Sequence, residues 1–555
     1  MPLSIFLTPF ALIFTINNQK SMLKKSIMKS SLFLLSINLL ATQVKAQLAP
    51  PQDKINYALE LIKYAYVDTV DSKKLTEEAI KAMVKNLDPH SVYIPLEEMR
   101  EMNEPLVGKF EGIGVQFNIH EDTILVTQPI PGGPSEKLGI RAGDRIVKID
   151  GAVVANIKIT NNDVFKKLRG DKGTKVTVSI YRRGNTELID YTITRDQIPI
   201  FSLDASYMVT PTIGYIKISR FADSTVDEFK EALSKLKKKG LESLILDLQG
   251  NGGGYLNRAV ELADEFLTEG KKIVFTRGRT SPPEDYTSSV IGGWEKGKIA
   301  ILVDESSASA SEIVSGAVQD WDRGLIIGRR SFGKGLVQKP FQLPDGSAIR
   351  LTVAHYYTPS GRCIQKPYAL GEEDEYELDF SNRLKSGELF YADSVKFADS
   401  TNYFTNSKRV VKGGGGIMPD LFVPLDTSSN STFYTDLLRK GVLGDFTLTY
   451  TDNHRAELLG KYPNIDTFKQ TFVLDDKLFA EFLAAGDKAG VKKDEAGLKI
   501  SEKALRIQLK ALLARNLWDT DAYFEVINDL NNSLNKAIEA INGNTFEKLK
   551  IAAVK

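Results

Sequence analysis

Between about residue 198 and residue 424 the sequence alternates strand-like and helical runs, and this alternation limits the fold more than any other feature. Two strand-like runs, "LESLILDL" at 241–248 and "IAILVD" at 299–304, are almost wholly apolar, as expected of strands buried on both faces of a parallel sheet. Helical runs such as "NRAVELADEFL" and "SASEIVSGAVQDW" follow them. Repeated alternation of this kind predicts an α/β sheet.

The rest of the chain follows other patterns, and its 555 residues are too many for one ordinary domain. Residues 47–105 and 426–555 place apolar side chains at i, i+3 and i+4, which predicts helical regions. Residues 106–195 consist of short alternating runs with glycine turns, which predicts a β-rich domain. The α/β core is therefore expected at 196–425, with the polar stretch 367–412 as a surface excursion.

Charge and cysteine usage exclude several classes of protein. The chain has 72 lysines and arginines against 71 aspartates and glutamates. This balance argues against nucleic acid as a binding partner and against a polybasic surface that would bind membranes. Its one cysteine, Cys363, cannot form an internal disulfide or a thiolate metal cluster. We therefore expect a core stabilised by packing alone, with no metal and no cofactor.

The N-terminal segment has the pattern of an export signal. Three lysines between residues 24 and 29 precede an apolar run over 32–40, and a small-x-small site ends at Ala46. A retained membrane anchor is the alternative, although the run is shorter than the roughly 20 residues that span a bilayer. We expect residues 1–46 to be a signal peptide and the protein to be exported to the periplasm, with inner-membrane contact only if this segment is retained.

A cluster of four serines, Ser-Ser-Ala-Ser-Ala-Ser-Glu at 306–312, lies between a buried strand-like run and a helical run. Ser309 and Glu312 fit a capping box, which requires no chemistry. A serine here would also lie at the carboxyl end of a parallel sheet and at a helix N-terminus, which favours negative charge. The motif alone is compatible with a helix cap and with a nucleophile.

Lys334, in "SFGKGLVQ" between two glycines, is the first candidate for a base that would activate Ser309. Burial lowers the pKa of a lysine, and a neutral amine can take a proton from a serine hydroxyl. None of the four histidines lies near either motif in sequence, although His355 could approach in space. A Ser–Lys pair is therefore better supported than a Ser–His pair.

A set of motifs in a fixed order extends these observations: "DPHSVYIP", "FEGIGV", "AGDRIVKIDG", "LILDLQGNGGG", "SASASE" with "FGKGLVQ", "YYTPSGRCIQ" and "GGIMPD". Over about residues 53–424 the chain resembles the carboxyl-terminal processing proteases, or tail-specific proteases, of the S41 peptidase type. The resemblance implies a multidomain α/β fold, with a ClpP/crotonase-like serine protease core and an inserted PDZ-like domain. Helical N- and C-terminal regions complete it.

The resemblance also assigns roles to residues. Ser309, the middle serine of the run, would be the nucleophile, Lys334 the general base 25 residues later, and Gln338 the group that orients the amine. Residues four apart in a straight strand lie about 13 Å apart, so Lys334 and Gln338 can touch only across a helical turn or a sharp bend. Backbone N–H groups of Ala310 and Gly253 are the expected oxyanion hole.

Two departures bear on the glycine loop at 252–254. It lacks the spacing and the lysine of a phosphate-binding loop, so a nucleotide site is not expected. Gln249 stands where the family usually has arginine, which places the support of the loop in question but not the Ser–Lys pair. Gly252 stands where the family often has proline, which makes Gly253 the better candidate for the oxyanion donor.

The PDZ-like domain should bind the free C-termini of protein or peptide substrates. Such domains hold a peptide carboxylate on backbone amides of a glycine loop, here Gly112-Ile113-Gly114-Val115. We expect Arg182 to report the bound tail to the protease core, with Arg183 as the next candidate and two solvated arginines as the alternative. A homo-oligomer and an adaptor protein remain open as further partners.

Three functions compete. The first is an exported serine endopeptidase that captures C-terminal tails and cleaves by a Ser–Lys(–Gln) mechanism. The second is a catalytically silent binding scaffold on the same fold, which an intact Ser309, Lys334 and Gln338 disfavour. The third is a crotonase-type acyl-transfer or hydratase enzyme, in which a PDZ-like domain would be hard to explain.

Overall fold

The computed structural model describes residues 50–289, 292–371, 376 and 378–551, and the chain divides into two units after Met83. The described part of the first unit contains helix α2 (Pro51–Ala65) and most of helix α3 (Ser72–Lys85). The predicted signal segment lies outside the described residues. The sheets and the candidate site described below belong to the second unit.

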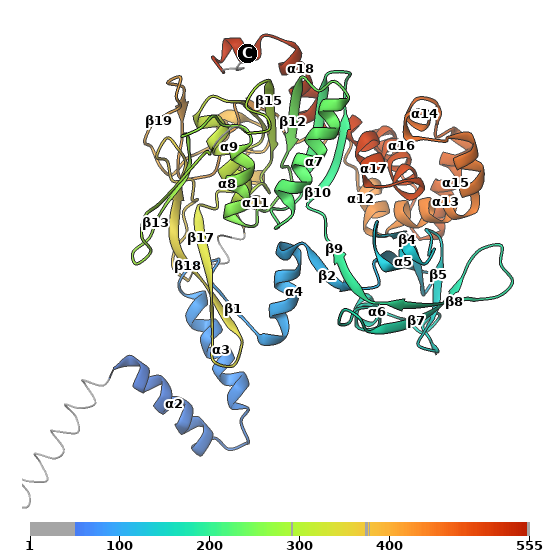
Figure 1. Cartoon of the computed structure of the whole chain (residues 1–555), viewed down its shortest axis with the longest axis horizontal. Coiled ribbons are helices and arrows are strands. Elements are labelled where there is room, and N and C mark those ends of the chain that lie inside the picture. Colours follow the sequence, from blue (N-terminus) through green and yellow to red (C-terminus); the bar gives the residue numbers. More distant parts are fainter. Residues whose placement is uncertain (1–49, 290–291, 372–375, 377, 552–555) are drawn as a thin grey trace, which may run out of the picture. The chain divides into compact units, whose positions relative to one another are not determined.

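The centre of the second unit is a six-stranded sheet in the order β10-β11-β12-β15-β16-β21 (Figure 1). Its strands, in the same order, are Leu203–Met208, Ile213–Ile218, Ser243–Asp247, Lys298–Val303, Leu325–Gly328 and Leu421–Phe422. Every neighbouring pair is parallel except β10 with β11. The two apolar runs of the sequence form β12 and β15, which are direct neighbours, so the predicted α/β sheet is confirmed.

Helices cover both faces of this sheet, as the apolar strands require. Leu244 and Leu246 of β12 belong to a buried cluster with α7 (Thr225–Lys238), α8 (Leu256–Asp264) and α9 (Ala310–Asp320). Ile245, between them, points to the opposite face and belongs to a second cluster that contains Leu534 of α18 (Asn532–Asn542). A helix from the C-terminal region therefore forms part of the core of the sheet.

A second, antiparallel sheet is formed by strands from several parts of the chain. Its strands are β1 (Val92–Ile94), β13 (Lys272–Arg277), β14 (Glu284–Thr287), β17 (Leu336–Gln342) and β18 (Ala348–Tyr357). The hairpin of β17 and β18 turns at residues 343–347, where Pro-Asp-Gly predicts it. The loop that precedes β17 carries Lys334.

The β-rich domain follows helix α4 (Leu96–Val107) and contains a sheet in the order β3-β4-β5-β7-β8. These strands are Val115–His120, Thr123–Pro129, Arg145–Ile149, Lys175–Tyr181 and Ile189–Thr194. Helices α5 (Pro134–Lys137) and α6 (Asn161–Leu168) accompany them, and β6 (Ala152–Val153) pairs with β5. The entering and leaving chains pair as β2 (Lys109–Gly112) and β9 (Asp196–Pro199), which joins the domain to the core.

The C-terminal region is helical, as predicted. Its helices are α12 (Thr432–Arg439), α13 (Val442–Lys461), α14 (Ile465–Thr471), α15 (Asp476–Lys488), α16 (Glu495–Leu517), α17 (Thr520–Ile527), α18 and α19 (Thr545–Lys548). Apolar side chains from α12 to α17 form a core of their own. The predicted fold class is thus confirmed in its α/β core, its β-rich domain and its helical C-terminus.

The stretch 367–412, interpreted from the sequence as a surface excursion, is exposed or half-buried along most of its described length, but it also contains buried charged residues. Arg383 of α11 (Asp379–Lys385) is 3% exposed and donates to the carbonyl oxygens of Ser331 (2.9 Å) and Phe332 (2.9 Å), in the loop that carries Lys334. Glu388 is also buried and forms a two-bond ion pair with Arg330 (2.6 and 2.9 Å). Charged residues of the stretch 367–412 thus form their pairs inside the protein, and the polar composition of the stretch does not reveal this.

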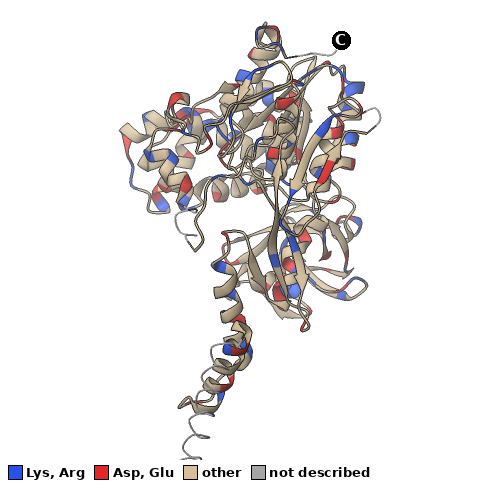
Figure 2. Ribbon diagram, turned by 90° about the vertical axis from the view of Figure 1, so that its left-hand side faces the viewer, with Lys and Arg blue, Asp and Glu red and all other residues tan. Residues whose placement is uncertain are grey.

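Charge is spread evenly over the described chain: Figure 2 shows lysines and arginines interspersed with aspartates and glutamates. This distribution agrees with the balance of 72 against 71 in the sequence. Within the described ranges, the helices lack the combined length and apolar character needed to cross a bilayer.

Candidate active site

Ser309 lies at the turn between β15 and α9, at the carboxyl end of the parallel sheet. Its φ of 54° and ψ of −111° depart from the extended conformation that ordinary N-cap residues adopt. A non-glycine residue held in such a conformation costs about 1–3 kcal/mol, and strained residues of this kind gather at functional sites. The backbone therefore favours the nucleophile over the simple helix cap.

Glu312, which is fully buried in α9, ties the Ser309 turn to the loop that carries Lys334. Its Oε2 accepts the N–H groups of Ser309 (2.8 Å) and Lys334 (2.9 Å). Its Oε1 accepts the Gly333 N–H (2.7 Å) and the Ser331 hydroxyl (2.5 Å). Burial raises the pKa of this carboxyl, and these hydrogen bonds oppose the rise. One side chain thus positions both segments.

The hydroxyl of Tyr356 on β18 makes a second tie between the same two segments. It lies 3.0 Å from the carbonyl oxygen of Ser309 and donates a hydrogen bond to the carbonyl oxygen of Lys334. Burial raises the pKa of this phenol well above its usual value, so the hydroxyl keeps its proton. The structure therefore brings Ser309 and Lys334 together through their main chains, 25 residues apart in sequence.

The surroundings of Lys334 weaken its positive charge. Burial first, and then the nearby guanidinium of Arg350, lower the pKa of its amine to about 8, although the carboxylates of Glu312 and Asp88 oppose this shift. A lysine with this pKa is partly neutral near physiological pH, as a general base must be.

Gln338 is placed differently from the expected contact with Lys334. Its Nε2 lies 3.4 Å from Oγ1 of Thr352, which in turn donates to Asp88 at 3.0 Å. Residues 336–342 form a strand with a register shift between Val337 and Gln338, and no helical turn joins it to Lys334. Within the described residues no hydrogen bond links Lys334 to Gln338, so this contact stays a prediction.

The two N–H groups expected to form the oxyanion hole differ in their hydrogen bonding: one is free of an acceptor among the described residues, and the other already has one. The Ala310 N–H begins α9 and has no acceptor among the described residues, as is usual for the first amides of a helix. Gly253 lies against Ser309, because a Cβ on it would come within 2.8 Å of the Cβ of Ser309. Its N–H, however, donates to Oδ1 of Asn251 at 2.8 Å. Its oxyanion role stays a prediction that requires this bond to open.

The histidines offer no competing base. His355 is exposed, and its neighbour Tyr356 is the β18 residue that faces Ser309 and Lys334, so the alternation of the strand turns His355 away. His90 lies near Lys334, but burial and that lysine's charge lower its pKa to about 4, and its Nε2 is engaged with the hydroxyl of Tyr376 at 2.9 Å.

The predicted carboxylate loop lies between β2 and β3 of the β-rich domain. Gly112 ends β2 and Val115 begins β3. The carbonyl of Ile113 accepts the Ser135 N–H and hydroxyl, whereas the N–H groups of Ile113 and Gly114 have no acceptor in the described part of the chain. Gly114 has a φ of 73°, a conformation that favours glycine. The loop therefore holds two amides without an acceptor among the described residues, and its role as a carboxylate site stays a prediction.

Arg182 and Arg183 point to different partners. Arg182 is bound to the buried Asp144 through its Nε (2.7 Å) and Nη2 (2.7 Å), both residues belonging to the β-rich domain. Arg183 reaches Asn453 of the C-terminal region and lies 3.7 Å from Asp452. The reporter role of Arg182 stays a prediction, and Arg183 is the one of the pair that contacts another domain.

Sequence reasoning missed several residues of the site. Glu312 was visible only as the end of a capping box, and Asp88 only as part of "DPHSVYIP". Tyr356 had no signal, because nothing in "AHYYTP" distinguishes its hydroxyl from that of Tyr357. The alternation of β18 is what separates them, and it requires the register of the strand.

Four known families match parts of the chain. Residues 212–373 match peptidase family S41, and residues 112–193 match the PDZ domain. Residues 19–98 match the N-terminal domain of the activating protease CtpB, and residues 433–519 match a family of unknown function. The two central matches coincide with the α/β core and the β-rich domain.

Curated relatives agree with these matches. A carboxy-terminal-processing protease of Bartonella bacilliformis is 39% identical over 311 residues, which cover 55% of this chain and 70% of that protein. The carboxy-terminal processing protease CtpB of Bacillus subtilis is 35% identical over 364 residues, 65% of this chain and 75% of the relative. A solved photosystem II D1 C-terminal processing protease is 25% identical, with 68% and 88% coverage and a TM-score of 0.33.

Proposed function

Because the chain belongs to the carboxy-terminal processing serine proteases of peptidase family S41, we propose that Ser309 is its nucleophile and Lys334 its general base. The observation that carries this proposal is the double tie between them, through the carboxylate of Glu312 and the hydroxyl of Tyr356. The purified protein should cleave an unfolded substrate, and the Ser309→Ala variant should not.

The mechanism follows from the protonation states. The neutral Lys334 amine takes the proton from the Ser309 hydroxyl as its oxygen attacks the carbonyl carbon of the substrate. The Ala310 N–H lies at the helix terminus beside the nucleophile and stabilises the oxyanion. The Lys334 ammonium then returns the proton to the leaving amine, and water hydrolyses the acyl-enzyme with the same base.

We propose that Gly253 supplies the second oxyanion donor and Gln338 orients the amine once the site is occupied. Gly253 requires the release of its N–H from Asn251, and Gln338 requires a bend in the first residues of β17. Substrate binding can drive both changes only if it favours the rearranged state. A docked substrate tail is a source of this preference.

We propose that the PDZ domain captures the C-terminal carboxylate of the substrate on the amides of Ile113 and Gly114. We predict that wild type cleaves a peptide with a free C-terminus at least about tenfold faster than the same peptide with an amidated end, because the amide removes the charge that the loop binds. The measurement compares kcat/KM for both peptides in wild type, Arg182→Ala and Arg183→Ala.

The two arginine variants locate the reporter of the bound tail. We expect Arg182→Ala to reduce the discrimination between the two peptides, with its melting temperature as a control, because the change leaves buried Asp144 unpaired. Discrimination that survives in Arg182→Ala and disappears in Arg183→Ala would move the role to Arg183. Equal cleavage of both peptides by wild type would contradict the proposal that a bound C-terminal tail promotes cleavage.

Export is proposed together with this function, on the strength of the charged, apolar and small-residue pattern before Gln47. We predict that protein isolated from its native cell begins near Gln47 and lies in the periplasm. N-terminal sequencing decides the point, since a chain that retains residues 32–40 would instead be anchored.

A further inference from the structure

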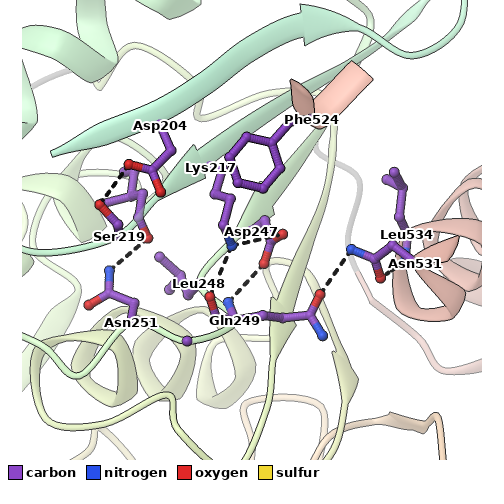
Figure 3. A network of polar contacts seen from close by, with 12 residues as sticks. Asp204, Lys217, Ser219, Asp247, Leu248, Gln249, Asn251, Phe524, Asn531 and Leu534 are labelled. Atoms are coloured by element: carbon purple, nitrogen blue, oxygen red, sulfur yellow. Dashed lines mark hydrogen bonds and ion pairs between the residues drawn. The ribbon is translucent and has the colours of Figure 1, made fainter. Parts of the chain in front are cut away.

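The glycine-rich loop beside Ser309 is held from two directions, by the protease core and by the C-terminal helical region (Figure 3). The loop begins at Gln249, two residues after the end of β12, and continues through Asn251 to Gly253. Gln249 is the residue at which the sequence departs from the arginine expected of the family. The contacts of its backbone and its side chain go to different parts of the chain.

The protease core holds the backbone of Gln249. Nζ of Lys217 donates to the Gln249 carbonyl oxygen at 2.9 Å and lies 3.3 Å from Oδ2 of Asp247. Oδ1 of Asp247 accepts the Gln249 N–H at 2.8 Å. Asp247 is nearly fully buried, so this ion pair holds the backbone of Gln249 in place at the end of β12.

The C-terminal region holds the side chain of Gln249. Nδ2 of Asn531 donates to Oε1 of Gln249 at 3.1 Å, and Oγ of Ser533 lies 3.5 Å from Nε2 of the same residue. Oδ1 of Asn531 accepts the Leu534 N–H at 3.1 Å and thereby caps α18. Figure 3 shows Asn531 between the helix and the loop. One asparagine therefore serves two separate purposes.

The loop that begins at Gln249 also contacts the residues on both sides of Ser309. Two residues later, the Asn251 carbonyl accepts the Ala308 N–H (3.0 Å) and the Ser311 hydroxyl (2.9 Å), on both sides of Ser309. The Asn251 side chain holds the Gly253 N–H. A displacement of Gln249 would therefore move the backbone that surrounds Ser309.

We propose that the C-terminal helical region is a positioning element of the active site, and that it acts through the contact of Asn531 with Gln249. This inference rests on the proposed function of Ser309. Neither residue touches the substrate; together they set the place of the loop at 249–254. The region at 426–555 is in this respect part of the catalytic unit and more than an appended domain.

The test uses full-length variants that break the contact from either side. Asn531→Ser keeps a residue that caps helices well but is too short to reach Gln249. Gln249→Ala removes the other partner, together with its longer contact to Ser533, and leaves the Asn531 cap of α18 in place. We expect each to lower kcat about tenfold with KM changed less than twofold, because a small misplacement of the catalytic backbone slows the chemical step. The kcat of the double variant should be no lower than that of the single variants, since both substitutions remove the same contact between Asn531 and Gln249.

Asn532→Ser is the matched control. It is the same substitution one residue later, and it removes an exposed hydrogen bond to Asp426 (3.0 Å) that does not reach the loop. It should keep the wild-type kcat. A wild-type kcat in Asn531→Ser, additive losses in the double variant, or an equal loss in Asn532→Ser would each overturn the inference. Cleavage that persists in Ser309→Ala would instead overturn the proposed function.

Discussion

Replacing Ser309 by alanine is expected to abolish peptide-bond cleavage, and replacing Lys334 by alanine is expected to do the same. A nucleophile and its base act as one unit, so each single variant should lose about 10⁴-fold or more in kcat and the double variant should lose no more than either. The measurement is the cleavage rate of an unfolded substrate by the three variants and wild type.

Folding of the variants is controlled by their thermal unfolding. Neither side chain packs in the apolar core, so the melting temperatures should stay within a few degrees of wild type. Near-normal proteolysis by Lys334→Ala would contradict the Ser–Lys assignment. The exposed face of β18 that carries His355 would then have to move for a histidine to serve as base.

The second large effect is expected at Glu312. Glu312→Gln keeps the shape of the side chain but replaces one acceptor oxygen by an NH₂ group. This NH₂ group would face backbone N–H groups that now donate hydrogen bonds to the carboxylate. We predict a loss of about 100-fold in kcat and of about 2–4 kcal/mol in the free energy of unfolding, because buried N–H groups lose their partner. Steady-state kinetics and denaturant unfolding measure the two effects.

Glu228→Gln is the matched control for this variant. Glu228 also lies in the first turn of a helix, α7, and its Oε2 accepts the N–H groups of Ser202 (2.9 Å) and Leu203 (2.9 Å). The same substitution should destabilise the protein and leave kcat near that of wild type. If both variants lost activity in proportion to stability, Glu312 would have no special part in positioning Ser309 and Lys334.

Local patterns of the sequence predict the framework of the site. The apolar runs of β12 and β15 are readable because strands covered on both faces have little polar surface. The place of Ser309 between a strand and a helix makes it a candidate, and the resemblance to the family selects it as the nucleophile. Lys334 is readable from its flanking glycines and its order after the serine cluster. These features depend on neighbours close in sequence, or on motifs with fixed order.

Contacts between distant segments are not readable in the same way. Asn531 meets Gln249 across 282 residues, and Arg383 meets Ser331 across 52, so no periodicity connects them. The buried charges of the insertion were not foreseen, because its charged residues look solvated until Arg330 is seen paired with Glu388. The predicted contact of Lys334 with Gln338 depends on local bending, which the structure shows as an irregular loop followed by a shifted strand.

The pH dependence of acylation tests the central claim, that a neutral Lys334 activates Ser309. A base works only when unprotonated, so the single-turnover rate should rise about tenfold per pH unit and level off at the pKa of the amine, about 8. Arg350 holds that pKa down, so in Arg350→Gln the pKa should rise and the plateau should begin at a higher pH. A wild-type profile that levels off near pH 6.5, the usual pKa of histidine, and does not move in Arg350→Gln would contradict the account.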